Sequence, residues 1–162
     1  FDAVNAWGNR ETNGIIPRAL AGEPPENLAM LLANAVYFSG TWRDRFDAAQ
    51  TSPGPFRLEN GGTVNVPMMR RDGGFRVVRT DRVVGVELPY GNAAYSMLVL
   101  MPTTEPVGTF VASLDSARLA PLLAGLQPAR ADEPLSLPKF TLTASRELSP
   151  VLRAMGMPRA FT

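Results

Sequence analysis

The most continuous run of hydrophobic positions in the chain extends from Leu28 to Phe38, and a single polar residue, Asn34, interrupts it. The run is too short and too continuous for an amphipathic surface helix, and Val36 and Tyr37 near its end favour a strand that is covered on both faces. A buried amide without a partner costs about 1–3 kcal/mol. The pattern therefore predicts a central strand in which the Asn34 side chain has a hydrogen-bond partner.

Hydrophobic positions spaced three or four residues apart predict helices in other parts of the chain. The first helix is expected to run from the N-terminus to about Thr12 and to end at Asn13-Gly14, because both of these residues tolerate the left-handed conformation that closes a helix. Shorter helices are expected at 110–114, at 116–126, where Pro121 intervenes, and at 148–155, before Gly156.

Alternating hydrophobic positions and turn residues predict antiparallel strands in the middle of the chain. Two short strands are expected on either side of Asn60-Gly61, because Asn-Gly is the strongest local hairpin signal. Pro67 places the second of them at a sheet edge or a bulge, since proline cannot donate to a ladder. The other strands are expected at 75–79, 83–88, 95–101 and 135–143. Helices and antiparallel strands follow one another without a βαβ rhythm, so the fold class is α+β with at least one mixed sheet.

Composition limits the kinds of partner. The chain has 162 residues, of which 45% are hydrophobic, and this is enough for one ordinary domain with a core. Its 16 Lys and Arg residues are nearly balanced by 15 Asp and Glu residues. The arginines between residues 70 and 82 alternate with acidic residues, which favours a solvated face over a polyanion site. No apolar run reaches the ~20 residues of a membrane-spanning helix. Neither a nucleic acid nor a membrane is therefore expected as a partner.

The chain contains no cysteine and no histidine. Without histidine there is no Ser-His-Asp triad, no imidazole base and no imidazole metal ligand. Without cysteine there is no disulfide, no zinc-thiolate site and no thiol nucleophile, whereas the compartment stays open. The bases that remain are scattered carboxylates and Lys139, the only lysine, which is expected to be a solvated strand residue. The sequence thus predicts no enzyme activity, no metal and no cofactor.

Two further features concern the origin of the chain. It starts at Phe1 in place of Met, with a helical face that no capping residue precedes, which indicates a fragment of a longer protein. Arginine is far more frequent than lysine, and Ala, Gly and Pro are abundant. This coding bias is typical of a GC-rich genome and suggests a bacterial source.

Five stretches of the sequence, taken together and in order, form a recognisable pattern. They are VNAWGNRETNGII, LLANAVYFSGTW, FRLENGGTVNVPMM, VVGVELPYGNAAYSMLVLMP and LSLPKFTLTASRELSPVLRAMGMPRAF. In this order they resemble the serpin family of protease inhibitors over nearly the whole chain. One departure is Ser39, which stands where the family often has lysine before Gly-x-Trp. The resemblance implies a serpin-like multi-sheet fold, in which residues 1–162 are a single partial serpin domain, incomplete at both ends.

The resemblance also implies a function. In serpins a target protease cuts an exposed bait loop, and the loop then inserts into the main sheet as an extra strand and traps the protease. Asn34 matches the family's shutter asparagine, which bonds across the opening of the sheet, and Trp42 matches the breach tryptophan, where insertion starts. The bait loop would follow Thr162, so the reactive-site bond is not in this chain. The implied partner is a serine protease, or a cysteine protease, and the implied location is secreted or extracytoplasmic.

Alternatives remain for both function and site. A serpin-fold carrier or chaperone that does not inhibit is the second hypothesis, and an unrecognised enzyme is the third. Asn34 and Trp42 also have a purely structural interpretation, as an amide bonded to a neighbouring loop and an indole that covers a core. Because strand edges of the main sheet are expected to be open, the partners include other fragments of the same serpin or a second copy of the chain.

Overall fold

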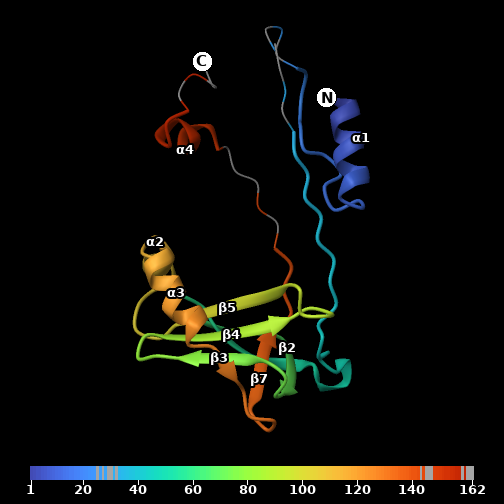
Figure 1. The fold of residues 1–162 in the computed structure, drawn as a ribbon. Coiled ribbons are helices and arrows are strands. Elements are labelled where there is room, and N and C mark those ends of the chain that lie inside the picture. Colours follow the sequence, from blue (N-terminus) through green and yellow to red (C-terminus); the bar gives the residue numbers. More distant parts are fainter. Residues whose placement is uncertain are drawn as a thin grey trace. The chain divides into compact units, whose positions relative to one another are not determined.

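The computed structural model of the protein describes residues 1–24, 26, 28, 31, 33–142, 144, 148–157 and 159. The helices are α1 (Asp2–Glu11), α2 (Val107–Ala112), α3 (Ser116–Ala124), α4 (Ser149–Ala154) and a short 3-10 helix, η1 (Ala48–Gln50). The strands are β1 (Ser52–Arg57), β2 (Thr63–Asp72), β3 (Arg76–Arg79), β4 (Val83–Pro89), β5 (Ser96–Pro102), β6 (Gln127–Pro128) and β7 (Pro134–Pro138) (Figure 1). The chain forms two compact units, Phe1–Arg43 with Pro89–Met97, and Asp44–Leu88 with Leu98–Thr162.

Helix α1 belongs to the first unit and ends where the sequence predicted. Asn13 and Gly14 have positive φ angles of 51° and 84°, which close the helix. Thr12 is only 1% exposed. Its hydroxyl donates to the Gly8 carbonyl at 2.7 Å and accepts from the Ile16 amide at 3.0 Å. Thr12 therefore ties the end of the helix to the chain that leaves it.

A second side chain of α1 holds the connection that follows the helix. Asn5 Oδ1 accepts from the backbone amides of Ala19 and Leu20, each at 2.9 Å. Asn5 Nδ2 donates to the Leu20 carbonyl, also at 2.9 Å. Both polar atoms of the amide are used, so the returning chain is fixed along the helix at this point.

The central strand expected between Leu28 and Phe38 is not formed. Residues 33–41 follow an extended path (Figure 1) but lie outside any strand, as do residues 28 and 31. A strand needs hydrogen-bonded neighbours, and none of the described strands pairs with this segment. The hydrophobic pattern thus indicated an extended backbone, but a strand requires partners that no local pattern can supply.

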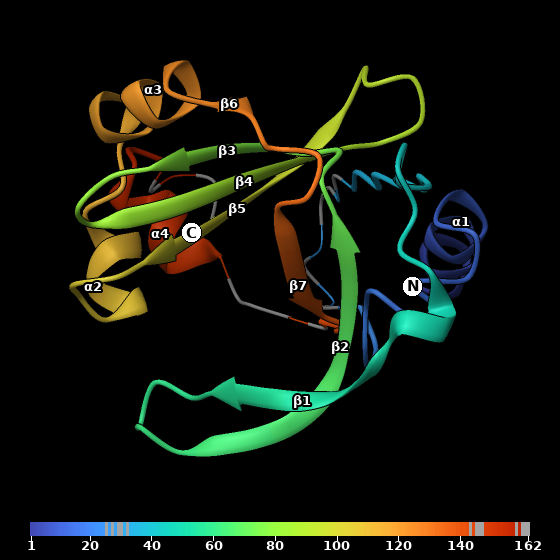
Figure 2. The same ribbon diagram turned by 90° about the horizontal axis from the view of Figure 1, so that it is seen from below.

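The second unit contains a three-stranded antiparallel sheet in the order β1-β2-β7. The hairpin of β1 and β2 forms around Asn60-Gly61, as predicted, and Figure 2 shows β1 beside the first part of β2 and β7 beside its last part. The prediction that Pro67 marks an edge or a bulge was wrong, because β2 is the central strand. Pro67 faces Pro53 across the hairpin and accepts from the Lys139 amide, one residue beyond the end of β7. Its missing N–H therefore falls where the ladder ends.

A four-stranded sheet has the order β5-β4-β3-β6 and includes the predicted antiparallel meander. Helices α2 and α3 pack on one face of this sheet. The core that they share is formed by Val78, Val83, Phe110, Leu122 and Leu126, with Leu98, Leu100 and Leu114 packed against it. Every strand pair with a defined register is antiparallel, so the predicted mixed sheet is not found among the described strands. Tight turns connect the strands of the meander, which leaves no room for a parallel crossover.

Gly85 lies in β4 beneath this core. A Cβ atom at Gly85 would lie 2.7 Å from Val78 Cγ1 and 3.0 Å from Leu100 Cδ2. The absence of a side chain thus allows the neighbouring strands to bring their side chains over β4.

The remaining helices follow the sequence closely. Helix α3 begins at the Asp115 cap, whose side chain accepts from the Arg118 amide at 2.8 Å, and it ends at Ala124 in spite of Pro121. Helix α4 is followed by Gly156 with a φ of 99°, as predicted. The last strand, expected at 135–143, stops at Pro138. Within the described ranges, no helix has both the length and the apolar character needed to cross a membrane.

Candidate functional site

Four aromatic rings in the first unit, Trp42 among them, form a chain of contacts. Trp42 and Tyr90 are stacked, with ring centroids 4.4 Å apart and planes inclined by 13°. The ring of Phe38 meets Tyr90 edge to face at 5.0 Å and Tyr95 at 5.6 Å. These residues, Phe38, Trp42, Tyr90 and Tyr95, are called the aromatic cluster below. It joins the end of the extended segment to the turn between β4 and β5.

The backbone reinforces the same contact. Trp42 and Tyr90 form an antiparallel bridge, which two hydrogen bonds flank. The Gly91 amide donates to the Thr41 carbonyl and the Arg43 amide donates to the Pro89 carbonyl, each at 2.9 Å. The bridge therefore fixes the backbone where the two rings stack.

The sequence Gly-Thr-Trp at the end of the hydrophobic run follows from this geometry. A Cβ atom at Gly40 would lie 2.9 Å from Phe38 Cζ and 3.0 Å from Tyr90 Cδ1. Gly40 thus leaves the space that the rings occupy, Thr41 supplies a carbonyl acceptor, and Trp42 supplies the stacking ring.

The turn that presents Tyr90 has a strained residue. Ala93 has a φ of 67°, a conformation that costs a residue with a Cβ atom about 1–2 kcal/mol. Its amide donates to the Tyr90 carbonyl at 2.6 Å, and the Tyr90 amide donates to the Tyr95 carbonyl at 2.9 Å. Asn92 Oδ1 accepts from the Ala94 amide at 3.1 Å. These bonds hold the turn in the shape that brings Tyr90 and Tyr95 to the same cluster.

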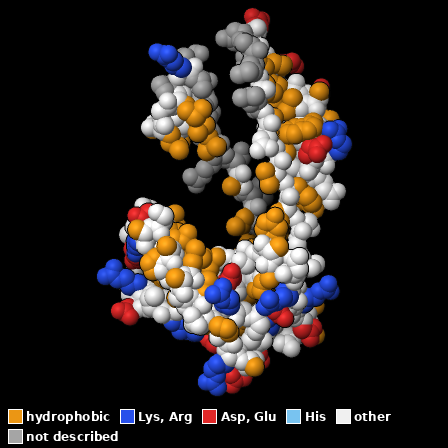
Figure 3. Space-filling view, viewed as in Figure 1, with side chains coloured by type: hydrophobic (Ala, Val, Ile, Leu, Met, Phe, Trp, Pro, Cys, Tyr) orange, Lys and Arg blue, Asp and Glu red, His pale blue; other side chains and the backbone are white. Residues whose placement is uncertain are grey.

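The aromatic cluster is only partly covered in this chain. Trp42 and Tyr90 are half-buried, whereas Phe38 is 52% exposed and Tyr95 is 68% exposed. Figure 3 shows hydrophobic side chains at the surface in several places on the face that it presents. The outer rings of the cluster are therefore accessible to a further apolar group.

Tyr37 lies next to the cluster and contacts the end of α1. Hydrogen bonds with the side chains of Asn13 and Ser39 lower the pKa of the Tyr37 hydroxyl, since they favour the phenolate. Ser39, the departure from the serpin pattern, thus takes part in a local polar contact.

Asn34 lies apart from the aromatic cluster. It lines a hollow of about 240 Å³ with residues of α1 and its connection, among them Val4, Trp7, Ile16 and Leu20. The prediction that Asn34 is buried was wrong, because the residue is exposed, and among the described residues its side chain has no hydrogen-bond partner. The reason is the one that prevents the strand: none of the described strands lies beside this segment.

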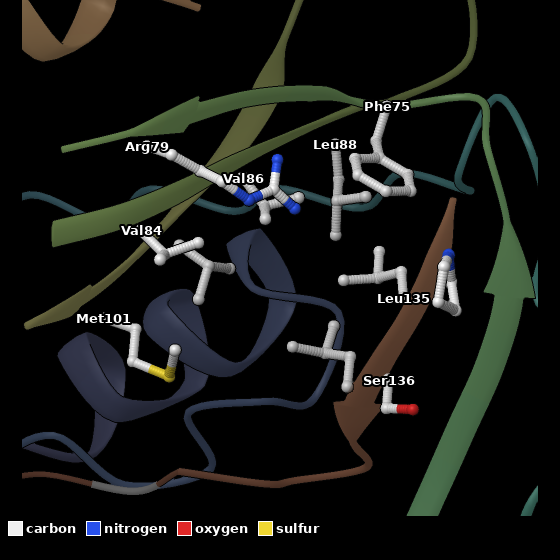
Figure 4. Close-up of a pocket in the computed structure, with 11 residues that line it drawn as sticks. Phe75, Arg79, Val84, Val86, Leu88, Met101, Leu135 and Ser136 are labelled. Atoms are coloured by element: carbon white, nitrogen blue, oxygen red, sulfur yellow. The ribbon is translucent and has the colours of Figure 1, made fainter. Parts of the chain in front are cut away.

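A second hollow, of about 200 Å³, lies in the other unit on the face of the four-stranded sheet opposite α2 and α3. Val84, Val86 and Leu88 of β4 and Leu135 of β7 point into it (Figure 4). The one charged residue in its lining, Arg79, is paired with Glu133. Apart from Arg79 and Ser136 the lining residues are apolar, so the hollow offers mainly a packing surface.

The described part of the chain has no group of three or more His, Cys, Asp or Glu residues that could hold a metal. Lys139 is exposed, as expected for a solvated residue, although it lies just beyond β7. Trp42 was predicted from the sequence, whereas the other three members of the aromatic cluster, Phe38, Tyr90 and Tyr95, were not. The available signal was the aromatic residues on both sides of the turn at 90–95, which only long-range pairing connects with Trp42.

Comparisons with known proteins agree with this arrangement. The family model for serpins, described as serine protease inhibitors, matches residues 1–162. An uncharacterized serpin-like protein of Thermococcus kodakarensis is 34% identical over 158 residues, which are 98% of this chain and 36% of that protein. The protein Iris of Ixodes ricinus is 35% identical over 163 residues, with 98% and 43% covered. The chain thus spans about two fifths of the length of these relatives.

Solved structures give the same result. Native protease nexin-1 with heparin has a TM-score of 0.84 at 28% identity, with 96% of this chain and 44% of that chain covered. Uncleaved ovalbumin has a TM-score of 0.85 at 28% identity, with 99% and 44% covered. A loop-inserted structure of a cleaved ovalbumin mutant has a TM-score of 0.80 at 25% identity, with 99% and 43% covered.

The relatives named above come from an archaeon and a tick, so they do not support the bacterial source that the composition suggested. Each match extends over nearly the whole chain and so includes all five stretches that resemble serpins. The chain belongs to the serpin family.

Proposed function

We propose that the intact protein is an inhibitory serpin, which traps a serine protease, or a cysteine protease, after cleavage of its bait loop. The family description supports the kind of partner. The similarity to both uncleaved and loop-inserted ovalbumin supports the kind of conformational change, because one fold of this region is compatible with both states. Secretion belongs to the same proposal and rests on the family resemblance alone.

One observation carries the proposal: residues 33–40 are extended but unpaired with any described strand. An extended segment with free backbone groups can accept a strand, and main-chain hydrogen bonds then supply the energy of addition. In the intact protein this segment would therefore be one side of the place where the cleaved loop inserts.

Trp42 and Asn34 have different parts in the proposed mechanism. Trp42 is fixed to Tyr90 by stacking and by the bridge, so it gives the accepting segment a firm end. Asn34 lies within the segment and is exposed, so its amide is available to a strand that lies beside it. The proposal therefore assigns Trp42 to the start of insertion and Asn34 to a latch across the opening.

The experiment is incubation of the intact protein with a panel of serine and cysteine proteases, followed by a denaturing gel. A covalent complex that survives denaturation is expected with at least one protease. The control is the same protease with its nucleophile blocked beforehand, which should give no complex. Cleavage without a stable complex for every member of the panel would favour the alternative function, a carrier or chaperone with a serpin fold.

A further inference from the structure

Strand β1 forms an outer edge of the three-stranded sheet, and its sequence is unusual for a strand. It contains Pro53 and Pro55, two residues apart, in a strand of six residues. Its partner on one side is β2, and no described strand lies on the other side. Edges of this kind are where another chain can add a strand.

Two hydrogen bonds show which residues of β1 point their backbone N–H and C=O groups toward β2 and which point them toward the outer edge. The Leu58 amide donates to the Gly62 carbonyl at 2.8 Å, just past the end of the strand, so even-numbered residues turn their polar groups toward β2. Independently, Pro67 accepts from the Lys139 amide at 2.8 Å and so turns its polar groups away from β1. Because Pro67 is opposite Pro53, this pair is of the non-hydrogen-bonded kind.

Both observations place the backbone groups of residues 53, 55 and 57 on the outer edge. Two of these three positions are proline, which has no N–H, and the third is Arg57. The amide of Thr51, just before the strand, is already used by the Ala48 carbonyl at 3.1 Å. The outer edge of β1 therefore offers one amide, and it lies beside a charged side chain.

The edge of the four-stranded sheet is different. The Tyr90 amide donates to the Tyr95 carbonyl, and the Thr103 amide donates to the Arg82 carbonyl. This alternation turns the amides of Leu98 and Leu100 away from β4, and β5 has no proline before Pro102. The outer edge of β5 thus presents backbone amides between apolar residues. The outer edge of β1, by contrast, has proline at two of its three outward positions and lacks those amides.

We infer that Pro53 and Pro55 close the outer edge of β1 to strand addition, by this protein's own strands or those of another chain. An added strand would lose two consecutive ladder bonds and would meet two proline rings at the positions where amides should donate. The placement of both prolines on the outer side, and of neither on the side of β2, is what gives them this effect. The hairpin itself keeps its ladder, because the inward-facing amides are those of Ser52, Gly54 and Phe56.

The experiment replaces both prolines with threonine, which restores the amides without adding a larger apolar surface. The variant P53T/P55T is compared with the natural protein and with the control P17T/P106T, in which two prolines outside the strands are replaced. Sedimentation velocity over a concentration series measures association, and hydrogen exchange measures protection of the amides at 53, 55 and 57.

The variant P53T/P55T is expected to associate at concentrations at least tenfold lower than the natural protein and the control, with new protection at those three amides. Unchanged association would overturn the inference, and so would stronger association that leaves the three amides unprotected. If the double variant does not fold, P55T alone is measured in the same way, and agreement with the natural protein then counts against the inference.

Discussion

Trp42 stacks on Tyr90 at 4.4 Å, and the same two residues form an antiparallel backbone bridge. Side-chain contact and backbone contact therefore coincide at a single pair that joins two distant parts of the sequence. Aromatic pairs of this geometry contribute about 0.5–1.5 kcal/mol beyond the area that they bury. The pair is thus the main local tie between the extended segment and the turn between β4 and β5.

A double-mutant cycle measures this tie. Trp42→Ala and Tyr90→Ala are each expected to lower the free energy of unfolding by about 1–3 kcal/mol, because both rings are half-buried. Their coupling energy should be about 0.5–1.5 kcal/mol by denaturant unfolding. As a control, Trp42→Ala is paired with Val111→Ala, an exposed residue of α2, and no coupling is expected. Additive effects of Trp42→Ala and Tyr90→Ala would show that the stacking of the two rings does not itself stabilise the fold.

Ala93 provides a test of the turn. Because its φ is 67°, Ala93→Gly should relieve the strain of a left-handed residue and raise the free energy of unfolding by about 1 kcal/mol. The neighbouring Ala94→Gly lacks this gain and should lower the free energy by about 0.5–1 kcal/mol through chain entropy. Thermal unfolding of the two variants checks the difference, and a stabilising Ala94→Gly would contradict it.

The sequence predicted those features that depend on neighbours along the chain. Asn13-Gly14 end α1 and Asn60-Gly61 connect β1 to β2 because the required backbone angles are local properties of these residues. The pairing of Trp42 with Tyr90 has no local signal. The position of Pro67 in a central strand is acceptable because its missing N–H faces β7 just beyond the end of that strand, and this fact concerns distant residues.

Gly85 tests how tightly the core is packed. In Gly85→Ala the new Cβ atom would be 2.7 Å from Val78 Cγ1, so the variant is expected to lose about 1–3 kcal/mol of the free energy of unfolding. The control is Gly108→Ala in α2, where no atom lies within 4 Å of the new Cβ. That variant should gain about 0.5–1 kcal/mol, because alanine is the better helix former. Equal effects of the two substitutions in urea unfolding would show that the packing over β4 is loose.

Glu133 should make the stability of the fold depend on pH. Its hydrogen bond with the Arg79 side chain, followed by that with the Arg130 backbone amide, lowers the pKa of its carboxyl below the ordinary value of 4.5. The unfolded chain therefore binds a proton more readily than the folded chain. The stabilisation is present above the unfolded pKa and is lost as the pH falls from there through the lower folded pKa.

Denaturant unfolding between neutral and acidic pH measures this dependence. In Glu133→Gln the acid-induced loss of stability should be smaller than in the natural protein, whereas Glu23→Gln, an exposed carboxylate of the first unit, should behave like the natural protein. Added salt should reduce the difference, because the Arg79–Glu133 pair reaches the surface. A Glu133→Gln curve that runs parallel to the natural one at every pH would refute the role of this carboxyl.

The substitution Asn34→Ala distinguishes the latch from the structural interpretation of this residue. A latch predicts a small effect in the 162-residue chain and a large effect in the intact protein. In the 162-residue chain the residue is exposed, so Asn34→Ala should change the free energy of unfolding by less than about 0.5 kcal/mol. In the intact protein a latch across the opening would be broken, its partner would be left unpaired, and the cost should be about 1–3 kcal/mol.

The kinetic effect of Asn34→Ala in the intact protein should be larger than that of an alanine substitution on an exposed strand. A sheet without its latch opens more readily, so Asn34→Ala should form loop-inserted or polymeric species faster on mild heating. Native gels follow this rate, and Thr63→Ala, an exposed residue of β2, sets the baseline. If Asn34→Ala and Thr63→Ala give the same rate and the same thermal midpoint in the intact protein, Asn34 is no latch. The mechanism would then depend on the segment and on Trp42 alone.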